Sequence, residues 1–467
     1  MKRRHKVATA VLSTLFVAVP GVAGAAAVAE PASSPSAGEC ADRPPRVPGA
    51  QHQQVACLDD LTTTGLARTG HTDPADWAGL TQEALPVPDA VPGMQIDGYF
   101  HDTSTTNTNH GWNHDSQFVL RLPENWNGGL VISGTPGNRE QYANDRAISD
   151  YVLAKGYAFA ATDKGNTGAE FYTDGRRPGD AIAEWNHRVT QLARAAKATV
   201  TQHYRQRPTT TIATGLSNAG YLVRWQLENH PELYEGGVEW EGTLWSEDGP
   251  NLVEYLPEVL TAYPRYAEGG EDAEAAHAAM VEAGFPEGSE FLWQSHYEIY
   301  WDLTQRIYRE EIDPEFDGDL RAGHPYCAPG APQCDADYDY SERPESVHEA
   351  VERIGLTGEI GKPLLTLHGT LDVLLPISED SDVYAEMVRE QGREHLHRYY
   401  RIEDGTHTDS FVDLHPDELR ALTPCHRTAF EALEAYLHDR TPMPESATIS
   451  RPADATPQDL VTTCDLR

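Results

Sequence analysis

The residues best suited to chemistry are a serine, an aspartate and a histidine, each of which follows a predicted strand. The serine lies in TTTIATGLSNAG at 209–220, a pattern that predicts a strand, a tight turn with Ser217 at its apex, and a helix. Such a turn strains the serine backbone and lifts its hydroxyl above the sheet. Alone, a Gly-x-Ser-x-Ala string is usually an ordinary turn. Its place between this strand and this helix favours a nucleophile.

A nucleophilic serine needs a base, and the base needs a carboxylate to orient it. The segment LLTLHGTLD at 364–372 is an apolar strand followed by a turn that delivers Asp372 at the carboxyl end. The segment YYRIEDGTH at 399–407 repeats this arrangement and ends in His407. The order serine, acid, histidine predicts that Ser217, Asp372 and His407 form a catalytic triad.

Asp372 and His407 could each have a simpler role, and other residues in the sequence could take their places in the triad. Asp372 could be a turn-forming aspartate and His407 an exposed loop histidine. Asp404 and Asp409 flank the histidine, and His368 precedes Asp372. We expect His368 to end its strand, with its side chain on the wrong side of the turn to act as the base.

Two backbone N–H groups should form an oxyanion hole near the serine. The first is predicted to be the N–H of Asn218, directly after the nucleophile. The second should come from the turn after the apolar strand at 128–134, where Pro136 has no N–H. Thr135 or Gly137 could donate, and Thr135 is favoured.

Around these residues, strands alternate with helices. Such alternation predicts an α/β protein with a mostly parallel central sheet covered by helices on both faces. The expected strands are 96–101, 117–122, 128–134, 157–162, 209–214, 237–240, 363–368 and 397–402, and the expected helices are 140–155, 180–206, 218–229, 378–391 and 426–438.

The alternation stops between 245 and 350, where the sequence is helical, acidic and rich in aromatic residues. We expect a large, mostly helical cap insertion at 246–348, whose aromatic side chains pack the cap itself and in part line a substrate pocket. This divides the chain into a signal peptide (1–29), a leader segment (30–56), a first core part (57–245), the cap and a second core part (349–467).

The first 29 residues predict export, because a basic start is followed by an apolar run and small residues suited to cleavage. No later stretch is apolar for long enough to span a bilayer. Six cysteines form an even set, which in an oxidising compartment favours disulfides. Proximity in sequence suggests the pairs 40–57, 327–334 and 425–464. We therefore expect a secreted, extracellular protein.

Composition narrows the classes of partner and cofactor. The net charge of −37 comes from 36 basic and 73 acidic residues, and it disfavours nucleic acid and anionic membranes as partners. The acidic clusters at 313–319 and 335–339 read mainly as solvated loops, with a structural calcium as the alternative, because neither matches an EF-hand loop. No cofactor or catalytic metal is predicted. Nothing in the sequence specifies an oligomeric state.

These motifs together resemble those of secreted α/β-hydrolase-fold serine esterases. The turn GTPG at 134–137 and the segment YAFAATDKGNTG at 157–168 resemble the tannase and feruloyl esterase group, which also has a large cap before the acid. The GLSN elbow is similar to that of hydroxybutyrate oligomer hydrolases. The resemblance covers about 120–245 and 360–440. Tannase-type enzymes bridge cysteines beside the nucleophile and the histidine, whereas this chain has Leu216 and Thr408 there.

The sequence thus predicts a serine hydrolase that cleaves carboxylic esters through an acyl-enzyme intermediate. The resemblance implies an aromatic ester or a hydroxyalkanoate oligomer as the small-molecule or oligomeric substrate. The alternatives are a secreted serine peptidase of the same fold, because a triad also cleaves amides, and a binding protein that has kept the fold without the chemistry.

Overall fold

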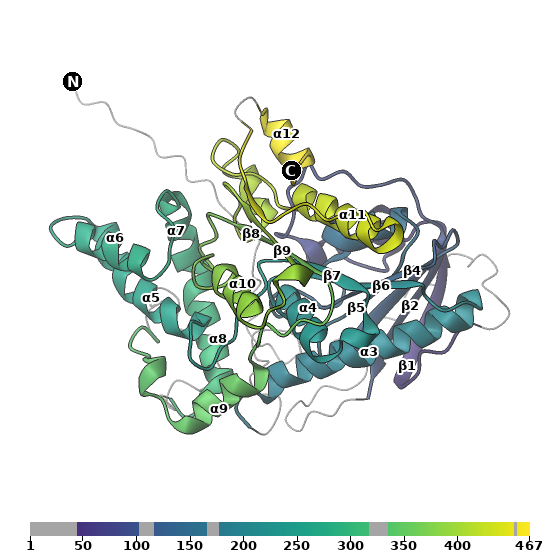
Figure 1. Cartoon of the computed structure of the whole chain (residues 1–467), viewed down its shortest axis with the longest axis horizontal. Helices are drawn as coiled ribbons and strands as arrows, with labels where there is room; N and C mark the ends of the chain where they lie inside the picture. Colours follow the sequence, from purple (N-terminus) through teal and green to yellow (C-terminus); the bar gives the residue numbers. More distant parts are fainter. Residues whose placement is uncertain (1–43, 102–115, 166–176, 317–334, 453–454) are drawn as a thin grey trace, which may run out of the picture. The chain divides into compact units, whose positions relative to one another are not determined.

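The computed structural model describes residues 44–101, 116–165, 177–316, 335–452 and 455–467. In this part of the chain, ten strands form one sheet in the order β1-β2-β3-β5-β4-β6-β7-β8-β9-β10 (Figure 1). The strands are β1 (Ala50–Leu58), β2 (Gly93–Phe100), β3 (Gln117–Pro123), β4 (Gly129–Ser133), β5 (Ala158–Thr162), β6 (Thr210–Leu216), β7 (Gly236–Trp240), β8 (Leu364–Gly369), β9 (His397–Ile402) and β10 (Ala447–Ile449).

The sheet is parallel from β5 to β10, and β1, β2 and β3 extend it as antiparallel strands. The central strands β4, β5, β6, β7 and β8 are buried along their whole length. Strands covered on both faces favour apolar side chains, as in β4 (GLVIS) and β5 (AFAAT). β6, β7 and β8 also bury polar residues, among them Thr211, Glu239 and Thr366. The predicted α/β class with a mostly parallel sheet is confirmed.

Helices bury both faces of the sheet. α3 (Asp180–Tyr204) and α4 (Asn218–Asn229) pack into one core cluster, while α2 (Asp150–Ala154) and α11 (Thr423–Asp439) pack into the other. The stripe predicted for α3 is buried along its whole length, and its members are Ile182, Trp185, Val189, Leu192, Ala196 and Val200. α10 (Ser381–Glu390) connects β8 to β9.

Between β7 and β8 the chain forms a group of helices, seen at the left of Figure 1. They are α5 (Leu252–Glu268), α6 (Ala273–Glu282), α7 (Glu290–His296), α8 (Asp302–Ile312) and α9 (Glu345–Ile354). Phe285, Trp293 and Trp301 are fully buried among them, so this aromatic run packs the helices together. α9 crosses the expected cap boundary at 348; the division of the chain into domains stays a prediction.

Two edge elements differ from the expected pattern. The leader was expected to extend to residue 56, whereas residues 50–58 form β1 and pair with β2. β1 contains several polar residues and is half-exposed, so its sequence lacks the apolar run of a central strand. The expected helix at 140–155 is a short π-helix, Asp145–Ser149, followed by α2.

Cys425 and Cys464 form a disulfide, as predicted, which ties α11 to the C-terminal segment. Cys40, Cys327 and Cys334, like residues 1–43, lie outside the described residues. No helix in the described ranges is long and apolar enough to cross a membrane.

A buried arginine on α4 connects the two halves of the core. Arg224 donates from Nε to Glu239 on β7 (2.9 Å), from one terminal nitrogen to Asp380 (2.9 Å), and from the other to Ser381 at the start of α10 (2.6 Å). Its guanidinium also lies 4.5 Å from the centre of the Tyr384 ring. All three charged side chains of this network are almost fully buried. Each therefore depends on the others for charge compensation.

Replacing Arg224 with methionine should destabilise the fold by about 3–5 kcal/mol, because two buried carboxylates lose their counter-charge. The midpoint of urea unfolding, followed by circular dichroism, measures this. The matched control is Arg389→Met, which removes an exposed ion pair with Glu386 and should leave the midpoint unchanged. Equal midpoints for the two variants would contradict the role assigned to Arg224.

Candidate active site

Ser217 occupies the turn between β6 and α4 in a strained conformation. Its φ of 57° and ψ of −128° lie in a region that non-glycine residues rarely adopt. Its N–H donates to the carbonyl of Trp240 on β7 (3.1 Å), and its carbonyl accepts from Tyr221 N–H (3.0 Å). A Cβ at Gly215 would lie 2.5 Å from the Ala219 Cβ, so the tight turn requires glycine there. The predicted strained elbow is therefore present.

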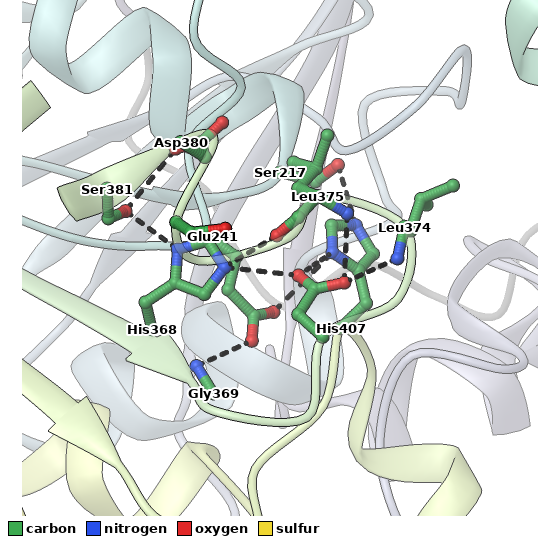
Figure 2. Close-up of polar contacts among 12 residues, drawn as sticks. Ser217, Glu241, His368, Gly369, Leu374, Leu375, Asp380, Ser381 and His407 are labelled. Carbon is green, nitrogen blue, oxygen red and sulfur yellow. Dashed lines mark hydrogen bonds and ion pairs between the residues drawn. The ribbon is translucent and has the colours of Figure 1, made fainter. Parts of the chain in front are cut away.

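His407 lies between the serine and an aspartate. Its Nε2 is 3.0 Å from Ser217 Oγ and its Nδ1 is 2.8 Å from Asp372 Oδ2 (Figure 2). A carboxylate can only accept, so Nδ1 carries the proton and donates it to Asp372. The lone pair of Nε2 then faces the serine hydroxyl, which is the arrangement that a general base requires.

Asp372 follows β8 and is fully buried. Its second oxygen, Oδ1, accepts from the N–H groups of Leu374 (2.7 Å) and Leu375 (3.0 Å). Burial by itself would raise the pKa of Asp372, but the neighbouring His407 and the hydrogen bonds from His368 and His407 hold it well below its ordinary value. The carboxylate is therefore charged over the whole physiological range.

The rival residues named from the sequence have other partners. Asp404 lies 3.2 Å from Arg451, and Asp409 accepts from the N–H groups of Leu422 (2.6 Å) and Thr423 (2.8 Å) at the start of α11. The expectation that His368 does not act as the base stays a prediction; its Nε2 lies 3.4 Å from Asp372 Oδ2. Its Nδ1 is 2.7 Å from Ser381 Oγ and its Nε2 is 2.8 Å from the Leu375 carbonyl.

The turn predicted to complete the oxyanion hole lies beside the elbow. Asn218 is the first residue of α4, so its N–H has no acceptor within the helix, and its side chain donates to the Gly137 carbonyl (3.0 Å). The hydroxyl of Thr135 donates to the Arg139 carbonyl (2.8 Å) and accepts from Lys164 Nζ (2.7 Å). The donation of the Asn218 and Thr135 N–H groups to an oxyanion stays a prediction.

Lys164 is an unexpected cation at this turn. It is fully buried, and its ammonium lies 5.2 Å from the centre of the Trp185 ring. Burial lowers the pKa of Lys164 to about 7 despite the adjacent Asp163. Sequence patterns could not single it out, because its burial results from packing against distant residues.

Helices between β7 and β8 contact this site. The indole of Trp301 donates to the carbonyl of Val373, next to the aspartate (2.7 Å), and Asn218 donates to the hydroxyl of Tyr308 on α8. His296, at the end of α7, stacks on Phe411 at 5.0 Å, and burial lowers its pKa to about 4. Ser217 itself is only 9% exposed.

A second acid, Glu241, lies beside the histidine and was missed in the sequence. It follows β7, is fully buried, and its Oε2 lies 3.6 Å from His407 Nδ1 (Figure 2). The available signal was its place at the carboxyl end of a buried strand, where side chains of neighbouring parallel strands meet.

Among the described residues, one cluster has the spacing of a metal site: Glu241, Asp372 and His407, whose ligand atoms lie within 4.8 Å of one another. His407 Nδ1 is a donor to Asp372 here and so has no lone pair for a metal. In the acidic clusters, Asp313 pairs with Arg343 (2.6 Å) and Asp335 with Arg309 (2.7 Å). The expectations of no cofactor and of a calcium alternative remain predictions.

Sequence comparison matches part of the second half of the chain to a known family. The family model described as 3HB-oligomer hydrolase matches residues 333–465. D-(-)-3-hydroxybutyrate oligomer hydrolases from Azoarcus sp. and Cupriavidus metallidurans are 30% and 31% identical over 120 and 98 residues, or 24% and 20% of this chain. These matches span 17% and 14% of the length of the two relatives.

Solved structures agree on the fold. Feruloyl esterase B from Aspergillus oryzae has a TM-score of 0.54 at 12% identity, with 85% of this chain and 89% of that chain covered. Tannin acyl hydrolase from Aspergillus niger has a TM-score of 0.51 at 12% identity, with 84% and 83% covered. The chain thus has the α/β-hydrolase fold, and its likeness to the feruloyl esterase and the tannase is one of fold. The resemblance to hydroxybutyrate oligomer hydrolases seen in its sequence is confirmed by the sequence matches.

The low pKa of Asp372 makes its contribution to folding depend on pH. A carboxyl whose folded pKa lies below its unfolded value, about 3.9 for aspartate, stabilises the fold above that value and loses this contribution as the pH falls through the folded pKa. The excess of the free energy of unfolding of wild type over that of Asp372→Asn should therefore shrink as the pH falls below about 4. Urea unfolding across this range measures the difference; a difference that grows with acidity would contradict the assignment.

Proposed function

We propose that this protein is a carboxylic-ester hydrolase in which Ser217 is the nucleophile, His407 the general base and Asp372 the orienting acid. One observation carries the proposal: His407 bridges the strained elbow serine and a buried carboxylate at 3.0 Å and 2.8 Å. Its sequence relatives are named as hydrolases and its fold neighbours as esterases, which supports this class of reaction.

The geometry supports the following sequence of steps. His407 Nε2 takes the proton of Ser217 Oγ, which attacks the ester carbonyl, and the N–H groups of Asn218 and Thr135 stabilise the oxyanion. The imidazolium, stabilised by Asp372, protonates the departing alcohol and leaves an acyl-enzyme. Water, deprotonated by the same nitrogen, then releases the acid and restores the serine.

The comparisons favour a hydroxybutyrate oligomer over an aromatic ester. The sequence match covers residues 333–465, which include Asp372 and His407, whereas the feruloyl esterase and the tannase share 12% identity and thus the fold alone. Leu216 and Thr408 in place of the bridged cysteines of tannase-type enzymes point the same way. We therefore propose a short hydroxyalkanoate ester as substrate. A peptide is the second candidate, because the same triad cleaves amides.

We further propose that the protein is exported. The basic, apolar and small-residue pattern of the first 29 residues supports this, and so does the disulfide between Cys425 and Cys464, because such bonds persist in oxidising compartments.

Replacing Ser217 with alanine should lower ester hydrolysis by roughly 1,000-fold or more, because the attacking oxygen is removed and no cavity is created. Initial rates on p-nitrophenyl butyrate, a 3-hydroxybutyrate trimer and an aminoacyl p-nitroanilide measure both the loss and the substrate class. Circular dichroism verifies that the variant is folded. A folded variant with near wild-type ester hydrolysis would refute the assignment, and cleavage of the anilide alone would favour the peptidase.

The acid is tested separately. Asp372→Asn should lower kcat/KM by roughly 100-fold or more, because the histidine loses the group that fixes its tautomer and stabilises its charge. Asp404→Asn is the matched control, since Asp404 pairs with Arg451 instead, and it should change kcat/KM by less than about threefold. If Asp404→Asn lowered kcat/KM more than Asp372→Asn, Asp372 would not be the orienting acid.

A further inference from the structure

Glu241 projects from the carboxyl end of β7 toward the histidine that Asp372 contacts from β8 (Figure 2). Its backbone has a φ of 53°, a strained value for a residue with a side chain. The Glu241 N–H donates to the Leu367 carbonyl on β8 (2.9 Å), which fixes this conformation. The end of β7 therefore holds a buried carboxyl beside His407, in a backbone conformation that costs energy.

The two oxygens of Glu241 have different environments. Oε1 accepts from the N–H of Gly369 (3.0 Å), whereas Oε2 is buried and has no hydrogen-bond partner among the described residues. This second oxygen is the one that lies 3.6 Å from His407 Nδ1. A buried polar oxygen without a partner is costly, so its orientation toward the imidazole calls for an explanation.

Negative charge surrounds this carboxyl. Burial first, and then the nearby Asp372, raise the pKa of Glu241 well above its ordinary value, with Asp409 and Glu239 adding to the effect. His407 is the cation-forming group next to it, and Arg224 is paired with Glu239. Burial and the charge on Asp372 thus both favour the protonated form of Glu241.

We propose that Glu241 is a second orienting acid for His407, able to accept the Nδ1 proton when Asp372 cannot. In the intact site, Asp372 accepts the His407 Nδ1–H and Glu241 remains protonated. With an uncharged residue at 372, one of the causes that favour the protonated form of Glu241 is removed, and in the ionised form a side-chain rotation brings Oε2 from 3.6 Å to hydrogen-bond distance of Nδ1. His407 Nε2 can then still take the proton of Ser217. Glu241 acts through the histidine, so it is a positioning residue, and the inference rests on the proposed function.

The alternative is that Glu241 only anchors the turn after β8 through Gly369. Its effect on catalysis would then be the same whether or not Asp372 is present. A double-mutant cycle separates the two roles, because independent effects multiply and coupled effects do not.

The experiment measures kcat/KM on p-nitrophenyl butyrate for wild type, Glu241→Gln, Asp372→Asn and the double variant. Glu241→Gln alone should change kcat/KM by less than about threefold, whereas in the Asp372→Asn background it should remove at least about tenfold of the residual activity. An equal factor in both backgrounds would overturn the proposal.

The pH profile gives a readout that an anchoring role would not change. In wild type the acid limb of kcat/KM reflects protonation of His407 and should have a slope of about one. In Asp372→Asn the activity also needs ionised Glu241, so the slope should approach about two and return to about one in the double variant. A slope of about one in Asp372→Asn would overturn the proposal even if Glu241→Gln does not fold.

Asp404→Asn is the matched control, since Asp404 follows the same strand as His407 and pairs with Arg451 at 3.2 Å. It should alter kcat/KM by the same factor with and without Asp372. The Ser217→Ala variant separates failure of the proposed function from failure of the role of Glu241. If Ser217→Ala keeps its activity, the proposed function is wrong. If Ser217→Ala is inactive but the effects of Glu241→Gln and Asp372→Asn on kcat/KM multiply, only the role of Glu241 is wrong.

Discussion

The buried guanidinium of Arg224 is the interaction on which the acidic centre of this protein depends. It neutralises Glu239 and Asp380, and its contact with Ser381 leads through His368 to Asp372. In a chain with a net charge of −37, acidic residues outnumber basic ones by 73 to 36, so most carboxylates have no basic side chain as a partner. A buried carboxylate without a partner would ionise only at high cost in free energy. Arg224 pairs with two carboxylates near Asp372, while His407 and His368 lie beside Asp372 itself.

The same architecture positions the serine. The elbow brings α4 so close to β6 that a side chain at Gly215 would meet Ala219, and a side chain at Gly220 would lie 2.7 Å from the Gly242 Cα. Arg224 lies on the same helix, two turns after Ser217. α4 thus begins directly after the strained Ser217 and also carries Arg224, which contacts Glu239 on β7 and Ser381 at the start of α10. Rigid support of this kind preorganises catalytic groups and limits the reorganisation that a reaction requires.

The helices between β7 and β8 contact the loops around Ser217 and Asp372. Trp301, Tyr308 and His296 contact the acid loop, the elbow and Phe411, respectively, and Ser217 is nearly covered. The three predicted triad residues all come from the core. Asp372 and His407 lie within residues 333–465, the part of the chain that matches the 3HB-oligomer hydrolase family model.

Local sequence determined much of this protein. Short apolar runs and Gly turns identified the central strands, and because parallel strands share one carboxyl edge, Ser217, Asp372 and His407 could be expected to meet there. Tertiary structure alone decided the rest. β1 is too polar to be recognised as a strand without its partner strand. Asp313 pairs with Arg343 and Asp335 with Arg309, and no sequence pattern links the members of either pair. Glu241 and Lys164 are significant only because packing buries them beside the site, and long-range packing leaves no local pattern in a sequence.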